Sequence, residues 1–327
     1  MLDTHYDLLS IAYVAYLKND YSYLEKISKY FNDKNVTSVI ANLYFMSREE
    51  MKVELHPEYY QDDVSVLEMF KKSKEIVDTF FPDTDILYSI EGADYITGPN
   101  ELEKLYDEGL DSLIMCWNTR NKYASGIRSN QGLTELGKEL LYKCFELGIG
   151  VDLSHANERS FYDMIYFVKK EQKKGRDICV YASHSNSRSL CDRERNLNDE
   201  QLNEIKRVNG LVGLLCNRNF VIQPEYKDTV TKEQQEEVYF EHINHVASII
   251  GINNVMIASD DMDFLKEVDS EYGETAIYKY GDIASKMSEG LNREYGYEIA
   301  YNIMYKNAHD KVFNKIRKKR NNKERGK

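Results

Sequence analysis

The sequence predicts an α/β protein, a (β/α)8 barrel of the TIM type with extra helices after the last strand. Eight short apolar segments alternate with longer segments whose apolar residues recur at helical spacing. The chain has 327 residues, about twice the usual domain length, and barrels of this type often reach that size as one domain. Together these observations favour one closed parallel barrel.

The expected strands are short runs rich in apolar residues. In chain order they cover residues 1–4, 36–45, 86–90, 112–116, 149–153, 178–182, 211–216 and 255–259. Because parallel barrel strands all end on one face, polar residues that follow these runs are expected to gather there.

Helices are expected between the strands, for example at residues 64–80, 134–147 and 238–250. Thr134 and Gly148 supply start and stop signals for the second of these. Two long connections are expected at 218–232 and 262–280, followed by C-terminal helices within 283–313. We expect one metal-dependent hydrolase barrel domain at residues 1–314. The basic residues 315–327 are expected to form a disordered tail.

Composition narrows the function classes. The formal net charge of −12 argues against nucleic acid as the main partner. Five cysteines without a paired Cys-x-x-Cys spacing favour reduced core thiols over a thiolate metal site. Charged residues near the start leave no room for a signal peptide, and no apolar run approaches the roughly 18 residues of a membrane span. We therefore expect a cytoplasmic protein without a membrane partner.

Side chains suited to metal binding follow five of the predicted strands. Two of the chain's seven histidines follow the fifth and sixth strands, each directly after a serine. The candidate ligands are His5 and Asp7 after the first strand, Glu91 after the third, His155 and His184 after the fifth and sixth, and Asp260 after the eighth. Imidazoles and carboxylates suit zinc or a similar divalent ion, and one carboxylate can bridge two ions.

Each candidate alone has a simpler structural explanation. His155 after Ser154 fits a helix N-cap beside a core histidine, and Glu91 fits a turn cap. Their coincidence at strand ends, with no equivalent cluster at strand starts, favours a metal site. His242 and His245 lie three residues apart on one helix face, where packing or support of other residues is favoured.

Several motifs occur in an order that is typical of a known family. They are Asp-Thr-His-Tyr-Asp at 3–7, Ser-Ile-Glu-Gly at 89–92, Gly-Leu-Thr at 132–134 with Gly137, Val-Asp-Leu-Ser-His at 151–155, Ser-His-Ser-Asn-Ser-Arg at 183–188 and Arg-Asn-Leu at 195–197. With these motifs the chain resembles the renal (membrane) dipeptidases, metallopeptidases of the amidohydrolase barrel superfamily. The resemblance extends over nearly the full length, up to the basic tail.

The resemblance implies a binuclear zinc site. It assigns His5 and Asp7 to one ion and His155 and His184 to the other, with Glu91 as the bridge between them. A hydroxide shared by the ions would attack the peptide carbonyl of the substrate.

Two further residues receive roles from the resemblance. Asp260 would move a proton from the attacking water to the leaving amine. Arg195 would bind the terminal carboxylate of the substrate, which favours dipeptides over internal peptide bonds. On the residues alone, Arg195 would belong to a solvated charge run at 192–195.

Two departures from the family pattern concern the substrate site. Trp117 stands where mammalian members have a histidine that helps stabilise the tetrahedral intermediate, so this contact must come from elsewhere. After Asp260 the family usually continues with an aromatic residue, Asp and Gly, whereas this chain has Asp261, Met262 and Asp263, which could change substrate preference. Secreted members carry signal peptides and some carry lipid anchors, so the membrane in the family's name is not transferred.

The leading hypothesis is a zinc-dependent dipeptidase that acts on dipeptides, including those with a D-residue, or on related small amides. The first alternative is another binuclear amidohydrolase activity, such as hydrolysis of lactones or N-acyl amino acids. The second is a metal-binding barrel without catalysis. Zinc, manganese and cobalt all accept this ligand set. Family members are often dimers, so a homodimer remains an option.

Overall fold

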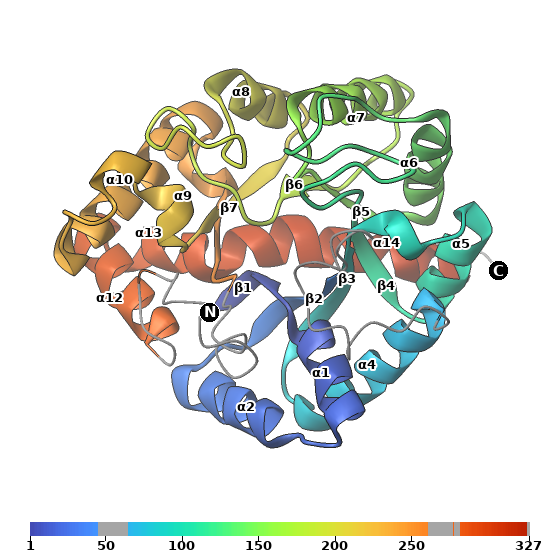
Figure 1. Ribbon diagram of the computed structural model, residues 1–327, viewed down its shortest axis with the longest axis horizontal. Coiled ribbons are helices and arrows are strands. Elements are labelled where there is room, and N and C mark those ends of the chain that lie inside the picture. The colour runs from blue at the N-terminus through green and yellow to red at the C-terminus, as the bar shows by residue number, and fades with distance from the viewer. Residues whose placement is uncertain (45–64, 261–276, 278–281, 326–327) are drawn as a thin grey trace.

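The computed structural model describes residues 1–44, 65–260, 277 and 282–325. Eight parallel strands form one sheet in which each strand pairs with the next along the chain. The strands are β1 (Leu2–Tyr6), β2 (Ser38–Tyr44), β3 (Asp85–Glu91), β4 (Leu110–Ile114), β5 (Gly150–Asp152), β6 (Val180–Ala182), β7 (Leu211–Leu215) and β8 (Val255–Ala258). They lie at the centre of the molecule, with helices around them (Figure 1).

The last strand returns to the first. The Thr4 hydroxyl of β1 donates a hydrogen bond to the Ile257 carbonyl of β8 at 2.9 Å. The Asp260 N–H donates to the His5 carbonyl at 3.2 Å. The sheet is therefore a nearly closed barrel, and the predicted (β/α)8 fold class is confirmed. All eight predicted strands are present with small shifts of their ends, and Phe45 at the end of the second lies outside the described residues.

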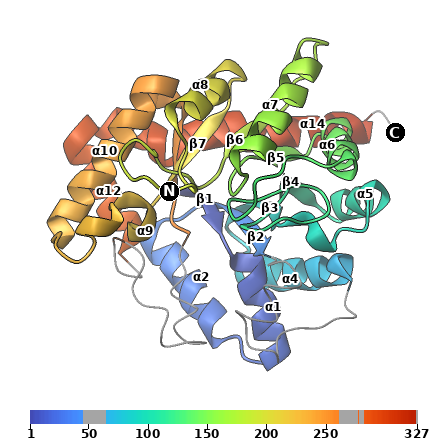
Figure 2. The same cartoon turned by 45° about the horizontal axis from the view of Figure 1, so that its top comes forward.

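Helices surround the strands and follow the last of them. They are α1 (Leu8–Lys18), α2 (Ser22–Lys34), α4 (Val66–Phe80), α5 (Pro99–Asp107), α6 (Glu135–Leu147), α7 (Glu158–Gln172), α8 (Asp199–Arg207), α9 (Arg218–Val221), α10 (Lys232–Ile250), α12 (Ile283–Tyr295), α13 (Tyr297–Tyr301), the π-helical segments η5 (Asn302–Lys306) and η6 (His309–Phe313), and α14 (Asn314–Arg325). Figure 2 shows the same arrangement from a second side.

Local sequence signals explain where several helices begin and end. The Thr134 side chain accepts a hydrogen bond from the Gly137 N–H at the start of α6, and Gly148 ends α6 in the left-handed conformation. Both expected signals are confirmed. Helix α10 begins earlier than the pattern indicated, because Thr231 and Gln234 form a capping box.

The two long connections have different outcomes. The connection predicted at 218–232 contains α9 and a short 3-10 turn (Pro224–Tyr226), so it is more ordered than a polar loop. Most of the connection predicted at 262–280 lies outside the described residues, as do Asp261, Met262 and Asp263.

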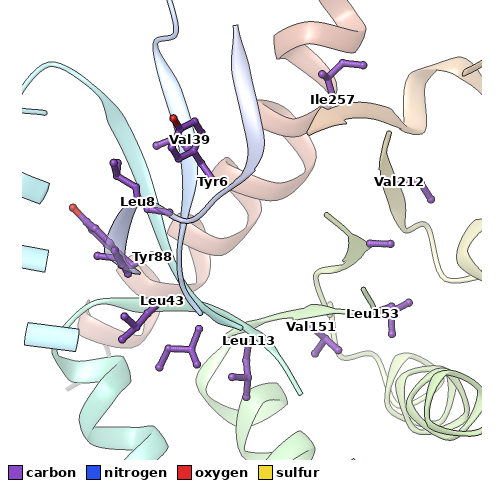
Figure 3. Packing of buried hydrophobic residues seen from close by; sticks show 14 of the residues in the cluster. Tyr6, Leu8, Val39, Leu43, Tyr88, Leu113, Val151, Leu153, Val212 and Ile257 are labelled. Atoms are coloured by element: carbon purple, nitrogen blue, oxygen red, sulfur yellow. The ribbon is translucent and has the colours of Figure 1, made fainter. Parts of the chain in front are cut away.

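Alternate residues of the strands pack on opposite sides of the barrel wall. In β2, Val39 and Leu43 belong to the large apolar cluster between the sheet and the helices, whereas Ile40 belongs to a smaller cluster. Figure 3 shows members of the large cluster, including Leu113, Val151 and other strand residues. The smaller cluster joins residues of six strands to the C-terminal segment, among them Tyr181. All five cysteines are buried and free, as expected for core thiols.

The C-terminal segment differs from the expected disordered tail. Helix α14 extends through Arg325, and its Ile316 is buried in the smaller cluster. The Arg317 guanidinium hydrogen-bonds the carboxylate of Asp85, the first residue of β3, at 2.8 Å. Figures 1 and 2 show this red helix running past several strands. The basic residues therefore bind acidic groups at the strand starts, and in the part of the chain described here no helix is both long and apolar enough to span a membrane.

Candidate metal centre

The six predicted metal-site residues converge at the carboxyl end of the barrel. Two of them lie in strands and four follow strands, and most of their side chains are buried. His5 lies in β1, Asp7 just before α1, Glu91 at the end of β3, His155 and His184 after β5 and β6, and Asp260 after β8. The barrel rule that placed them on one face is therefore confirmed by their mutual distances.

The backbone of β1 is irregular where it presents His5. Between Asp3 and Tyr6 the pairing with β2 shifts, so that three steps along β1 match two along β2. Such a bulge re-aims a side chain. His5 Nε2 then lies 3.0 Å from Glu91 Oε2 and 3.8 Å from Asp7 Oδ1. The sequence argument placed His5 and Asp7 on one side of an extended strand, but Asp7 occupies the N-cap position of α1. The turn from β1 into α1, and not an extended strand, therefore brings the two side chains together.

The second pair of imidazoles lies on the other side of Glu91. His155 Nε2 and His184 Nε2 are 2.9 Å apart, so both ring nitrogens point at one place. Glu91 Oε1 lies 2.8 Å from His155 Nε2 and 3.5 Å from His184 Nε2. His155 has a left-handed backbone with φ 66°, which is uncommon for a side chain with a Cβ and typical of functional positions.

Two overlapping groups of ligand atoms result. One contains His5, Asp7 and Glu91, the other Glu91, His155 and His184, and each could hold a metal ion. A third group joins His5 and His184 to Asp260, whose Oδ1 is 3.7 Å from His5 Nε2. Glu91 is shared by the first two, with a different oxygen toward each.

Buried polar atoms without partners support metal binding at these groups. Among the described residues, Asp7 Oδ1 and His5 Nε2 are buried without a hydrogen-bond partner, although His5 Nε2 lies 3.0 Å from the Glu91 carboxylate. A buried donor or acceptor without a partner is costly and calls for an explanation. A bound cation would satisfy both atoms, so the residues present fit a divalent metal.

The electrostatics of the site also favour a cation. Burial raises the pKa of Glu91, but the imidazoles of His5 and His155 outweigh burial and hold its pKa well below the usual range. Burial lowers the pKa of His155 to about 4 and that of His184 well below its ordinary value. These two imidazoles are therefore neutral near pH 7, which is the form that binds metal.

His5 differs because carboxylates surround it. Burial lowers its pKa, but Glu91, Asp260 and Asp7 outweigh burial and raise the pKa to about 10. Without a metal ion, the acidic cluster thus holds a proton at His5. A divalent ion would replace that proton, so that metal uptake at this group releases a proton.

Arg195 is buried beside this cluster. Its side chain is 4% exposed, which excludes the solvated charge run considered from the sequence. Nη1 donates to the Ser185 hydroxyl at 2.9 Å, and Nη2 has no hydrogen-bond partner among the described residues. Burial lowers the pKa of Arg195, and the nearby carboxylates Glu91 and Asp260 act in the opposite direction. A guanidinium nitrogen is thus available for an anionic group.

Trp117 lies beside the second pair of imidazoles. Its ring centroid is 5.9 Å from that of His155 and 5.1 Å from that of Tyr44. The Arg128 guanidinium lies 5.7 Å from the centre of the same ring. Trp117 therefore lies beside one of the candidate ligands, between the rings of His155 and Tyr44.

Sequence reasoning missed the residues that hold the ligand rings. Asn118 Oδ1 lies 2.9 Å from His155 Nδ1, and the Ser183 hydroxyl lies 2.7 Å from His184 Nδ1. In the sequence, Asn118 follows Trp117 and Ser183 precedes His184. This position next to a predicted site residue was the one signal from which the sequence could have identified them.

His242 and His245 lie away from this centre. His242 Nδ1 accepts a hydrogen bond from the Ser187 N–H at 3.1 Å, and Nε2 lies 3.0 Å from the Val221 carbonyl. His245 pairs with Asp199 at 2.8 Å. The expected packed role is confirmed for His242, which is fully buried, whereas His245 is partly exposed.

Comparison with known proteins identifies the family. A model of the membrane dipeptidase family, peptidase family M19, matches residues 32–324, which is most of the chain. The chain belongs to the membrane dipeptidase family. The matched range starts after His5 and Asp7, so these two ligands rest on the resemblance of residues 3–7 and on their position in the barrel.

Curated relatives share between a quarter and a third of the aligned residues. An uncharacterised protein of Klebsiella pneumoniae is 29% identical over 180 residues, 52% of this chain and 62% of that protein. An uncharacterised dipeptidase of Schizosaccharomyces pombe is 27% identical over 211 residues, 62% of this chain and 47% of its own length. The chain therefore spans about half the length of the curated relatives it matches.

Solved structures of membrane dipeptidase family members share the fold. A metallopeptidase of family M19, dipeptidase AC, superposes with a TM-score of 0.70 at 20% identity, covering 95% of this chain and 97% of that chain. A metallopeptidase from Rhodobacter sphaeroides, liganded with a phosphinate mimic of L-Ala-D-Ala, gives a TM-score of 0.69 at 20% identity, with 95% and 98% coverage. At this identity the likeness concerns the fold.

Proposed function

We propose that this protein is a metal-dependent dipeptidase that binds two divalent ions, with zinc as the leading candidate. One observation carries the proposal. The buried Glu91 carboxylate presents Oε2 to His5 at 3.0 Å and Oε1 to His155 at 2.8 Å, so one side chain serves two ligand groups. Membership of the membrane dipeptidase family supports the same conclusion.

Each residue then has a defined task. When bound, the ions would supply a water molecule whose pKa is lowered toward neutrality. His5, Asp7, His155 and His184 would hold the ions, with Glu91 between them. Asp260 would accept a proton and deliver it to the leaving amine. Burial and the charge of Glu91 raise the pKa of Asp260, while His5 and Arg195 lower it, and the net direction is upward.

Arg195 limits the substrate to a short peptide. Its partnerless Nη2 would bind the free carboxylate of the second residue, and Trp117 would line the same space. Because the Rhodobacter sphaeroides relative carries a mimic of L-Ala-D-Ala, dipeptides with a D-residue belong among the candidate substrates. Five free buried thiols fit a reducing compartment such as the cytoplasm, where we place the protein.

The test combines metal analysis with a substrate panel. Bound metal per chain is measured first, followed by cleavage of L,L and L,D dipeptides with and without a chelator. The same dipeptides with an amidated C-terminus serve as matched controls for the Arg195 contact. We expect about two ions per chain, cleavage that the chelator abolishes and zinc restores, and loss of cleavage with the amidated forms.

The outcomes separate the candidate functions. Two ions without dipeptide cleavage would contradict the dipeptidase proposal and direct the search to lactones, N-acyl amino acids or a binding role. Cleavage of amidated and free dipeptides alike would remove the proposed role of Arg195. Absence of bound metal after zinc reconstitution would contradict the metal centre itself.

A further inference from the structure

The Ser183 hydroxyl lies between imidazoles that belong to different ligand groups. Its Oγ is 2.7 Å from His184 Nδ1 and 3.3 Å from His5 Nδ1. The rings of His5 and His184 are close together, with centroids 3.6 Å apart. Ser183 is fully buried, so water does not compete for this hydroxyl.

The hydrogen-bonding capacity of a hydroxyl matches this position. A histidine that binds metal through Nε2 carries its proton on Nδ1 and becomes a donor there. Ser183 Oγ has two lone pairs, which can accept from His5 and His184 at the same time. Its own proton can go to the Ser154 hydroxyl, whose Oγ lies 3.4 Å away. Both lone pairs and the proton of the hydroxyl then take part in hydrogen bonds.

Neighbouring groups hold Ser183 in place. Its N–H donates to Asp152 Oδ1 at 3.0 Å, and its carbonyl accepts from the Thr4 hydroxyl at 2.7 Å. Asp152 Oδ1 also accepts from the Ser154 N–H at 3.0 Å. The hydroxyl therefore has a fixed location, as a group that orients other side chains requires.

The two imidazoles depend on Ser183 to different degrees. His5 Nδ1 has a second neighbour, the Asn42 amide, whose nitrogen lies 3.1 Å away and whose oxygen has no hydrogen-bond partner among the described residues. With a proton on Nδ1, the amide would present this oxygen instead. For His184 Nδ1, the described residues offer Ser183 as the hydrogen-bond partner. Loss of the hydroxyl should therefore weaken the His184 group most and the His5 group to a smaller extent.

We propose that Ser183 is a positioning residue that orients one histidine ligand of each metal ion and thereby couples the two metal sites. This inference rests on the proposed function for the presence of two ions. The Ser183 hydroxyl fixes the proton of His5 and His184 at Nδ1 and keeps Nε2 of both rings directed at the ligand cluster. Asp152 supports it by accepting from the Ser183 N–H.

The test measures zinc affinity in place of activity. Zinc is titrated against a chromophoric chelator in the wild type, Ser183→Ala and Ser89→Ala. Ser89 is a matched control, because it is an equally buried serine near the end of β3 whose hydroxyl has no hydrogen-bond partner in the described part of the chain. We expect Ser183→Ala to weaken both zinc sites, one by about 10–100-fold and the other less, and Ser89→Ala to leave both unchanged.

A spectroscopic readout distinguishes positioning from a general structural effect. In the zinc-loaded wild type, the Nδ1–H protons of His5 and His184 should give NMR signals protected from exchange with water. Ser183→Ala should shift both signals and speed their exchange. If Ser183→Ala does not fold, Ser183→Cys decides, because the thiol occupies the same place but is a much weaker hydrogen-bond acceptor than the hydroxyl.

Each result bears on the proposal. Weakening of both sites with movement of both ring protons supports it. Weakening of one site alone, unchanged affinities, or an equal effect of Ser89→Ala overturns it. A wild type that binds two zinc ions without cleaving dipeptides would refute the proposed function and leave this test intact.

Discussion

At the scale of single residues, each imidazole of the centre faces a polar group that is not itself a candidate ligand. His155 faces Asn118, His184 faces Ser183, and His5 faces both Asn42 and Ser183. Such contacts fix which ring nitrogen is free and where it points. The protein itself therefore orients the rings of these candidate ligands, which would reduce the ordering needed for metal uptake.

Glu91→Gln tests the shared carboxylate. The amide keeps the size of the side chain but removes the negative charge that faces His5 and His155, and its nitrogen cannot bind a cation. We expect zinc affinity to fall by more than the roughly 10–100-fold typical of a supporting residue, with loss of dipeptide cleavage. Competition with a chelator measures the affinity. Glu135→Gln, on an exposed side chain of α6, is the control, and zinc affinity equal to the wild type in Glu91→Gln would exclude the bridge.

Asp260→Asn separates proton transfer from metal binding. Asp260 Oδ1 lies 3.7 Å from His5 Nε2, yet its side chain keeps 17% exposure and so faces both the cluster and the substrate side. We expect kcat to fall by about 10²–10⁴ while bound zinc per chain stays the same. Steady-state kinetics with metal analysis of the same sample measures both. Full activity would exclude the proton-transfer role, and loss of zinc would show that Asp260 is a ligand.

At the scale of elements, two buried carboxylates join the ends of neighbouring strands. Asp3 Oδ1 accepts from the N–H groups of His5 and Ser259, at 3.2 and 2.9 Å, and so ties β1 to the end of β8. Asp152 does the same for β5 and β6 through Ser154 and Ser183. Burial raises the pKa of Asp3 to about 6, against the effect of its hydrogen bonds. The two carboxylates hold the strand ends that carry the ligands.

The spacing of β6 and β7 gives a prediction at this scale. A Cβ at Gly213 would lie 1.8 Å from the Ser183 carbonyl oxygen and 2.5 Å from Thr4 Oγ1. Gly213→Ala must therefore displace the backbone of Ser183, and we expect it to cost at least about 1–3 kcal/mol of folding free energy and to weaken zinc binding. Chemical denaturation and zinc titration measure the two effects.

Gly98→Ala is the control for this substitution. A Cβ at Gly98 meets nothing within 4 Å, so its folding free energy should change by no more than about 0.5 kcal/mol. If Gly213→Ala had the stability and zinc affinity of the wild type, the close approach of β7 to β6 at this glycine would not be required for either property.

The sequence predicts the elements better than their contacts. Apolar periodicity located the strands, and the barrel rule then brought His5, Glu91 and His155 to one face without any knowledge of distances. The β1 bulge carries no comparable local signal. The Asn118 contact with His155 joins residues 37 positions apart, and such pairings depend on the register of strands that the pattern alone does not set.

At the scale of the whole molecule, the two ends of the barrel have different tasks. The carboxyl end carries the candidate metal centre, whereas α14 covers the strand starts and contributes Ile316 to the apolar cluster there. This division is typical of TIM barrels, in which one face serves catalysis and the other stability. From composition alone, residues 315–327 resemble a solvated tail, because the acidic partners lie far away in the sequence; Arg317 and Asp85 are 232 positions apart.

Arg320→Met tests whether α14 stabilises the barrel. Arg320 Nη2 donates to the Leu110 carbonyl at 2.6 Å and to Asp111 Oδ1 at 3.0 Å, and its guanidinium lies over the Tyr106 ring. Without it, the buried Asp111 keeps one hydrogen bond, from the Tyr88 N–H. We expect a loss of about 1–3 kcal/mol of unfolding free energy near neutral pH, with zinc affinity unchanged.

The pH dependence of this loss identifies its cause. Burial raises the pKa of Asp111, and Arg320 is the largest effect that opposes burial, so the pKa rises further in Arg320→Met. Above that pKa the variant keeps an unpaired buried charge, and below it the protonated carboxyl removes the penalty. The stability difference from the wild type should therefore be largest near neutral pH and shrink on acidification. Urea unfolding at several pH values measures it, with Arg325→Met, at an exposed position of α14, as the control. A difference that is constant with pH would assign the role of Arg320 to packing on Tyr106 instead of charge.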